Sequence, residues 1–93
     1  MQELPEIRAI ALVREHIAAE RLDTTGYPLD QLVAERFSVG WIVFVPVQRG
    51  QIAIDRAIFY VGDDEVIEHA TSATAPLEYA AGFEQRYRQR AMT

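Results

Sequence analysis

The sequence predicts one α+β domain over residues 1–93, with an N-terminal helix, an antiparallel sheet of three or four strands and a C-terminal helix. Three observations predict this class. Apolar residues near the N-terminus recur at helical spacing, the middle of the chain is rich in β-branched and aromatic residues, and a proline leads an amphipathic segment at the end. A length of 93 residues is enough for a single compact core.

The first helix is expected from Pro5 to about Leu22, because proline is tolerated in the first turn of a helix. Its apolar positions follow three- and four-residue spacing, with His16 expected to face solvent. These positions are Ile7, Ile10, Val13, Ile17 and Ala18. The segment 23–28, with glycine and proline, predicts a turn after the helix.

The middle of the chain predicts strands. Residues 32–38 form a first strand, or residues 30–34 begin as a helical turn instead. Residues 41–47 are dense in β-branched and aromatic types, with Trp41, Val43, Val45 and Val47 on one face and Ile42 and Phe44 on the other. Since both faces are apolar, this strand is expected in the centre of the sheet or under two helices.

A hairpin and a second helix complete the predicted fold. Residues 57–61 and 66–70 are expected to pair across an acidic turn at 62–65. The last helix is expected to begin at Pro76 and to bend or break near Gly82. The predicted core face of this helix comprises Leu77, Ala80, Ala81, Tyr87 and the stem of Arg88. Most aromatic residues are expected in the core, with a partly open sheet face as the alternative.

Composition excludes several classes of function. Fourteen acidic residues against nine basic ones give a formal charge of −5, which disfavours nucleic-acid binding. Without cysteine the chain has no disulfide, no thiolate zinc site and no cysteine nucleophile. Its longest apolar run is too short to cross a membrane, and the acidic N-terminus lacks the pattern of a signal peptide. We therefore expect a cytoplasmic protein.

The residues that could carry chemistry are few. His16 stands in the first helix, and His69 stands in a strand, where a partner would come across the sheet from Tyr60 or an acid. The acids at 63–65 do not have the alternating spacing of a calcium loop. We expect no catalytic residue, no cofactor and no metal. A small enzyme that uses Glu68, His69 or the acidic turn remains the minor alternative.

Three segments follow one another in the chain: residues 37–41 with the apolar run that follows, the strand–acidic turn–strand unit at 57–67, and residues 74–79 before a short acidic helix. In this order they resemble a small bacterial family known as immunity protein 35, or YrhB-like domains. The chain departs from the pattern at Arg56 and Ala57, where a Gly-x-Ala-Pro-like entry is expected, and in its arginine-rich tail.

The resemblance implies a small cytoplasmic protein that is encoded beside a toxin, binds it and blocks it, without catalytic residues of its own. An acidic surface suits the capture of basic enzymes such as nucleases. Asp63, Asp64 and Glu65 at the predicted hairpin tip, together with Tyr60, are the candidate partner-binding residues. The alternative is a self-associating structural or adaptor protein that forms a homodimer and has no toxin partner.

Overall fold

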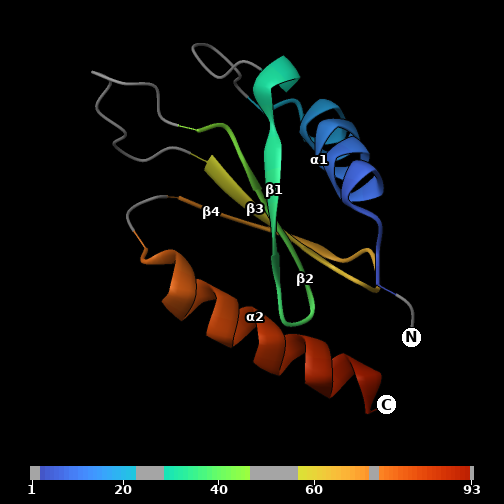
Figure 1. Cartoon of the computed structure of the whole chain (residues 1–93), viewed down its shortest axis with the longest axis vertical. Coiled ribbons are helices and arrows are strands. Elements are labelled where there is room, and N and C mark those ends of the chain that lie inside the picture. Colours follow the sequence, from blue (N-terminus) through green and yellow to red (C-terminus); the bar gives the residue numbers. More distant parts are fainter. Residues whose placement is uncertain (1–2, 23–28, 47–56, 72–73, 93) are drawn as a thin grey trace.

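Two helices enclose a four-stranded antiparallel sheet in a computed structural model of the chain, which describes residues 3–22, 29–46, 57–71 and 74–92 (Figure 1). Helix α1 spans Glu6–Glu20 and a short 3-10 turn, η1, spans Leu29–Gln31. The strands are β1 (Val33–Phe37), β2 (Gly40–Phe44), β3 (Ala57–Gly62) and β4 (Ile67–Thr71), and helix α2 spans Pro76–Ala91. This order confirms the predicted α+β fold.

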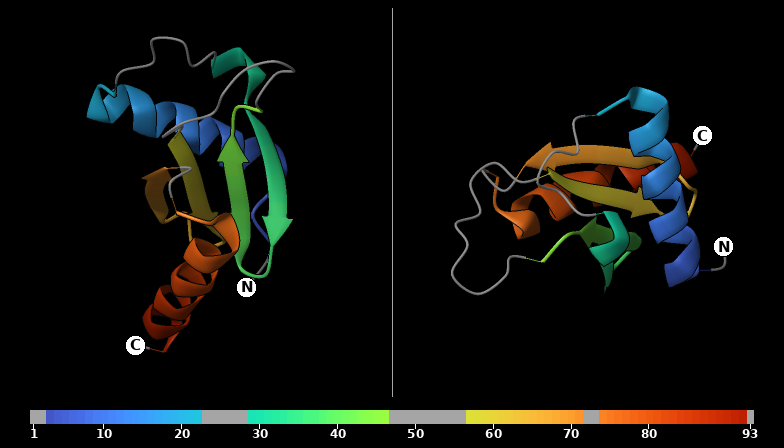
Figure 2. Two further views of the ribbon diagram at one scale, coloured as in Figure 1. Left: turned by 90° about the vertical axis from the view of Figure 1, so that its left-hand side faces the viewer. Right: turned by 90° about the horizontal axis from the view of Figure 1, so that it is seen from above.

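The strands lie in the sheet in the order in which they occur in the chain, and each pairs with the next by antiparallel hydrogen bonds. Figure 2 shows α1 and α2 on opposite faces of this twisted sheet. The central position predicted for the strand at 41–47 is confirmed for its described part, since β2 lies between β1 and β3 and contributes to the core on both faces. Val47 and the turn predicted at 23–28 lie outside the described residues.

The core under α1 is aliphatic around one aromatic ring. Trp41, Val43 and Val45 share this face with Phe59, as the alternation predicted, although Trp41 is only half-buried. Helix α1 packs on it through Ala9, Val13 and Ile17. The expectation for Ile7 is wrong, because its side chain is 81% exposed and Ala9 takes the inner position instead. Ala9 is four residues before Val13, so it lies on the same apolar face of the helix, and a small side chain is enough at this position.

The core under α2 is aromatic. Tyr60 and Phe83 are fully buried there, and the Phe37 ring packs edge-on to both. Helix α2 begins at Pro76 as predicted but runs through Gly82 without interruption. Its predicted inner face is wrong at Leu77, which is 84% exposed, and at the exposed Ala81. The large ring of Phe83 buries more surface than either, so it sets the rotation of the helix.

Gly40 is where two strands approach too closely for a side chain. A Cβ added to this residue would overlap the backbone carbonyl of Val61 on the neighbouring strand. The strand predicted at 32–38 is confirmed, because β1 spans Val33–Phe37. The alternative of a helical turn at 30–34 is wrong, because the turn η1 ends at Gln31, before the strand begins. No helix among the described residues is long and apolar enough to cross a membrane.

Candidate functional site

The turn between β3 and β4 carries the three acids that the sequence singled out. Its backbone closes through hydrogen bonds from Gly62 N–H to the Val66 carbonyl (2.9 Å) and from Glu65 N–H to the Gly62 carbonyl (2.8 Å). Glu65 adopts the left-handed conformation with φ 67°, and the Asp64 carboxylate accepts the Val66 N–H at 3.2 Å. The turn is therefore an ordered element rather than a loose tip.

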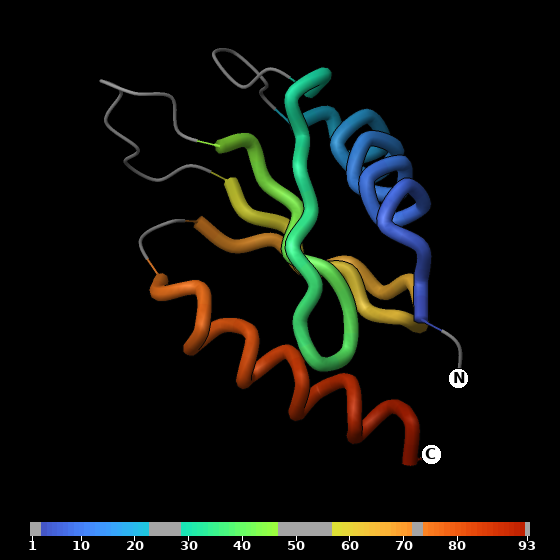
Figure 3. The backbone as a smooth tube through the Cα atoms, viewed as in Figure 1, coloured from blue at the N-terminus to red at the C-terminus, as the bar shows by residue number. Residues whose placement is uncertain are grey.

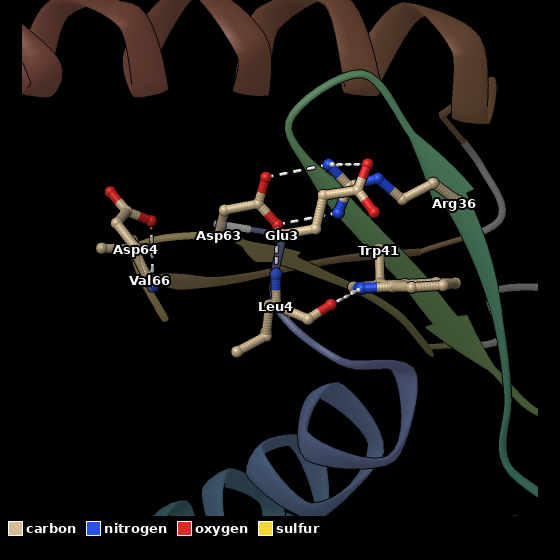
Figure 4. Close-up of polar contacts among 7 residues, drawn as sticks. All are labelled: Glu3, Leu4, Arg36, Trp41, Asp63, Asp64 and Val66. Carbon is tan, nitrogen blue, oxygen red and sulfur yellow. Dashed lines mark hydrogen bonds and ion pairs between the residues drawn. The ribbon is translucent and has the colours of Figure 1, made fainter. Parts of the chain in front are cut away.

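Asp63 has the least exposed side chain of the three acids. Figure 4 shows its contacts with Arg36 and Leu4. Its carboxylate accepts Nη1 and Nη2 of Arg36 at 2.7 and 2.8 Å, and the backbone N–H of Leu4 at 2.9 Å. Only 10% of its side chain is exposed. The hydrogen bond with Arg36 lowers the pKa of Asp63, against the opposing effect of burial. This carboxylate is charged in the folded chain, and its contacts stabilise the fold.

The cluster extends from Asp63 to the only tryptophan. The Arg36 guanidinium lies 5.6 Å from the centroid of the Trp41 ring, and the Trp41 indole N–H donates to the Leu4 carbonyl. Glu3 adds a looser ion pair to Arg36 at 3.7 Å. Figure 3 shows the N-terminal segment meeting the β3–β4 turn, and these contacts hold it there.

The two remaining acids of the turn pair with arginines from the two helices. Asp64 accepts Nε of Arg90 from α2 at 2.9 Å, and Glu65 accepts Nη2 of Arg8 from α1 at 3.3 Å. Arg36 comes from β1, so the three acids connect the turn to three different elements. The three charges are therefore already paired inside the folded chain, without a partner. Whether Glu65, the most exposed of the three, also contacts a partner stays a prediction.

Tyr60, the fourth candidate, does not lie on the surface. Its side chain is 0% exposed, its ring centroid is 4.4 Å from that of Tyr79, and its hydroxyl has no hydrogen-bond partner among the described residues. Burial raises the pKa of this phenol. The proposal that Tyr60 contacts a partner is therefore corrected: the ring fills the core under α2.

A second polar cluster joins β4 to α2. Glu68 accepts Nε of Arg86 at 2.9 Å and Nη2 at 2.7 Å, and the Tyr79 hydroxyl donates to it at 2.8 Å. Burial opposes the charged form of Glu68, but hydrogen bonds from Arg86 and Tyr79 outweigh it and hold the pKa below its usual value. Burial, followed by the hydrogen bond to Glu68, raises the pKa of Tyr79.

Both histidines pack against Phe59. The His69 ring stacks on it with centroids 4.8 Å apart, and the His16 ring meets it edge-on at 6.0 Å. The expectation that His16 faces solvent is wrong, since it is half-buried on the inner side of α1. The strand register places His69 opposite Phe59 rather than opposite Tyr60 or an acid. Glu68 and His69 lie on opposite faces of the sheet and do not form one site.

Among the described residues, the charge outside the ion pairs is negative. Six described carboxylates form no ion pair with another described residue. Only two described arginines form none, and one of them, Arg14, donates a hydrogen bond to the Leu29 carbonyl. The carboxylates are Glu6, Glu15, Glu20, Asp30, Glu35 and Glu78, and the arginines are Arg14 and Arg21. No group of three His, Asp or Glu residues in the described ranges is arranged to hold a metal ion.

Comparison of the chain with protein-family models, curated proteins and solved structures found no significant match.

Proposed function

We propose that this chain is a non-catalytic binding protein of the immunity type, which inhibits a bacterial toxin encoded beside it. The observation that supports this most is the distribution of charge. The arginines of β1 and α2 are engaged in ion pairs inside the molecule, whereas six described carboxylates against two arginines remain outside such pairs. The surface offered to a partner is therefore acidic, which favours a basic enzyme such as a nuclease.

The ion pairs within the chain support a binding role in a second way. Asp63, Glu68 and their arginines connect secondary-structure elements to one another, and both histidines pack on a core phenylalanine. Ionisable groups are thus used to hold one rigid shape. A preformed surface reduces the ordering cost of association, which a tight stoichiometric inhibitor requires.

Growth of cells that express the toxic domain encoded next to this chain tests the proposal. Co-expression of the chain is expected to restore growth, and co-purification is expected to recover a complex of the two proteins. The matched control is Ile17→Asp, which places a charge in the core under α1 and should abolish rescue by unfolding the chain. Continued growth arrest with a folded, expressed wild-type chain would contradict the proposal.

Self-association into a homodimer is the second candidate function, as a structural or adaptor protein. The observation in its favour is the apolar pair at the edge of the sheet, in which Val33 is 37% exposed and stands opposite the half-buried Phe44. Sedimentation equilibrium of the purified chain tests it, because a homodimer has twice the sequence mass of 10.5 kDa.

A further inference from the structure

The strand β1 leaves one edge of the sheet open to an additional strand. β1 is the first strand of the order β1-β2-β3-β4, so within the described ranges its backbone pairs with β2 alone. Alternate residues of such a strand direct their N–H and C=O groups toward the free edge. An edge of this kind accepts an extended peptide through main-chain hydrogen bonds.

The sheet face beside this edge, on the α2 side, is apolar and incompletely covered. Val33 and Phe44 lie directly opposite each other in the β1–β2 register, and Val33 is 37% exposed. The aromatic core under α2 includes Phe37 and Ile42, whereas Val33 and Phe44 are not part of it. The contact with α2 therefore ends before this corner of the sheet.

Glu35 occupies the middle of the edge strand. It is exposed, stands opposite Ile42, and forms no ion pair with another described residue. Its neighbour Arg36 points to the other face, where Asp63 and Trp41 hold it. On the α2 side, β1 thus presents one negative charge between two apolar side chains, Val33 and Phe37.

We propose that β1 binds an extended segment of the partner by strand addition, with a basic residue of that segment opposite Glu35. Residues two positions to either side of the basic residue would be apolar, because they would lie against Val33 and Phe37. The segment required has the pattern apolar–x–basic–x–apolar. This inference rests on the proposed function, since it assigns the surface that the toxin contacts.

A second copy of this chain is a poorer occupant of the edge. Two-fold antiparallel pairing centred on Glu35, the middle residue of β1, would set this carboxylate opposite its own copy. The formal charge of −5 on each copy adds to the repulsion. A basic segment would be attracted both to Glu35 and to the net negative charge of the chain. Charge therefore favours a basic partner over a second copy of this chain.

A synthetic peptide tests the assignment without the toxin. The probe has valine, arginine and valine at alternate positions with threonine or serine between and around them, and it is titrated into the full ¹⁵N-labelled chain. One control peptide has glutamate in place of arginine. Another keeps arginine but carries N-methyl groups on alternate amides, which block strand addition and preserve the side chains. The protein variant is Glu35→Gln, an exposed and nearly isosteric change.

We expect the arginine peptide to shift the amide signals of residues 33–37 and to bind about fivefold more tightly than the glutamate peptide. Glu35→Gln should remove most of that difference, and N-methylation should abolish binding.

The proposal is overturned by shifts centred elsewhere, by equal affinity of the two peptides, by undiminished binding of the N-methyl peptide, or by no binding at millimolar peptide. It is also overturned if Glu35→Gln dimerises while the peptide does not bind, since Glu35 would then only guard the edge. Growth rescue by the chain in any of these cases would preserve the proposed function and remove β1 from the site.

Discussion

Arg36 donates both of its terminal Nη groups to the Asp63 carboxylate, at 2.7 and 2.8 Å, and this pair connects the edge strand β1 to the β3–β4 turn at the other side of β2. The same carboxylate accepts the Leu4 N–H and so fixes the segment that enters α1. One side chain of the acidic turn thus orders three distant parts of the chain. The acidic turn therefore has a role in stabilising the fold, apart from any role in binding a partner.

Asp63 and Glu65 should differ sharply in their effect on stability. Asp63→Ala leaves a half-buried guanidinium and a backbone N–H without their acceptor, so we expect it to lower the free energy of unfolding by about 2–3 kcal/mol. Glu65→Ala removes an exposed ion pair and should cost less than about 0.5 kcal/mol. Urea unfolding measures both, and equal effects would show that Asp63 is no structural ion.

Stability should fall on acidification because two carboxylates are held in the charged form. The pKa of Asp63 and that of Glu68 are both lowered in the folded chain. The stabilisation is present above the unfolded-state values of roughly 4 and is lost as pH falls through the lowered folded values. Urea midpoints measured from pH 6 to pH 2.5 should therefore decline below about pH 4. Asp63→Asn should show a shallower decline, and an unchanged profile in that variant would contradict the assignment.

Phe59 should be the most costly core residue to truncate under α1. Its ring is 1% exposed and lies between two histidines and the aliphatic residues of α1, so Phe59→Ala is expected to cost about 3–5 kcal/mol. Ile7→Ala, in helix α1, is the control. The Ile7 side chain is 81% exposed, so its truncation should change stability by less than about 0.5 kcal/mol. Thermal or urea unfolding decides; a large effect at Ile7 would mean that α1 is rotated.

The two glycines Gly40 and Gly82 should respond to alanine in opposite directions. Gly40→Ala forces a methyl group against the Val61 carbonyl, which separates β2 from β3, and we expect a loss of more than about 2 kcal/mol. Gly82→Ala lies inside α2, where the nearest atom is Nη1 of the half-exposed Arg86 side chain at 3.2 Å, and should gain about 0.5–1 kcal/mol. Similar effects of the two substitutions on the urea midpoint would refute the register of β2 and β3.

The order of elements could be predicted from the sequence because periodicity and turn residues are local signals. Strand alternation placed Val43 and Val45 on one face, and proline marked the start of α2. The inner faces of the helices were less predictable, since Ala9 and Phe83 were chosen over Ile7 and Leu77 by packing against a sheet whose twist is not local. Helical spacing alone allows several rotations of a short helix.

The candidate site depended on contacts between residues far apart in sequence. Asp63 and Arg36 are separated by two strands, and the roles of Arg8, Arg36 and Arg90 follow only from the assembled sheet. One signal was available: Arg36 and Trp41 form the second residue pair from the two-residue turn and stand opposite each other in the hairpin register. That pair would have indicated a polar cluster on the α1 face. Tyr60 was misassigned because a tyrosine in a central strand looks the same in sequence whether its hydroxyl is buried or exposed.

Titration of the toxic domain with this chain tests the central claim, stoichiometric inhibition, most directly. The activity of a fixed amount of the domain is measured after increasing amounts of the chain are added, and each mixture is followed over time. The account predicts that activity falls linearly, reaches zero at equal molar amounts of the two proteins, and does not change with further incubation. Progressive loss of toxin activity at a small molar fraction of the chain would contradict it, because that result requires turnover rather than binding.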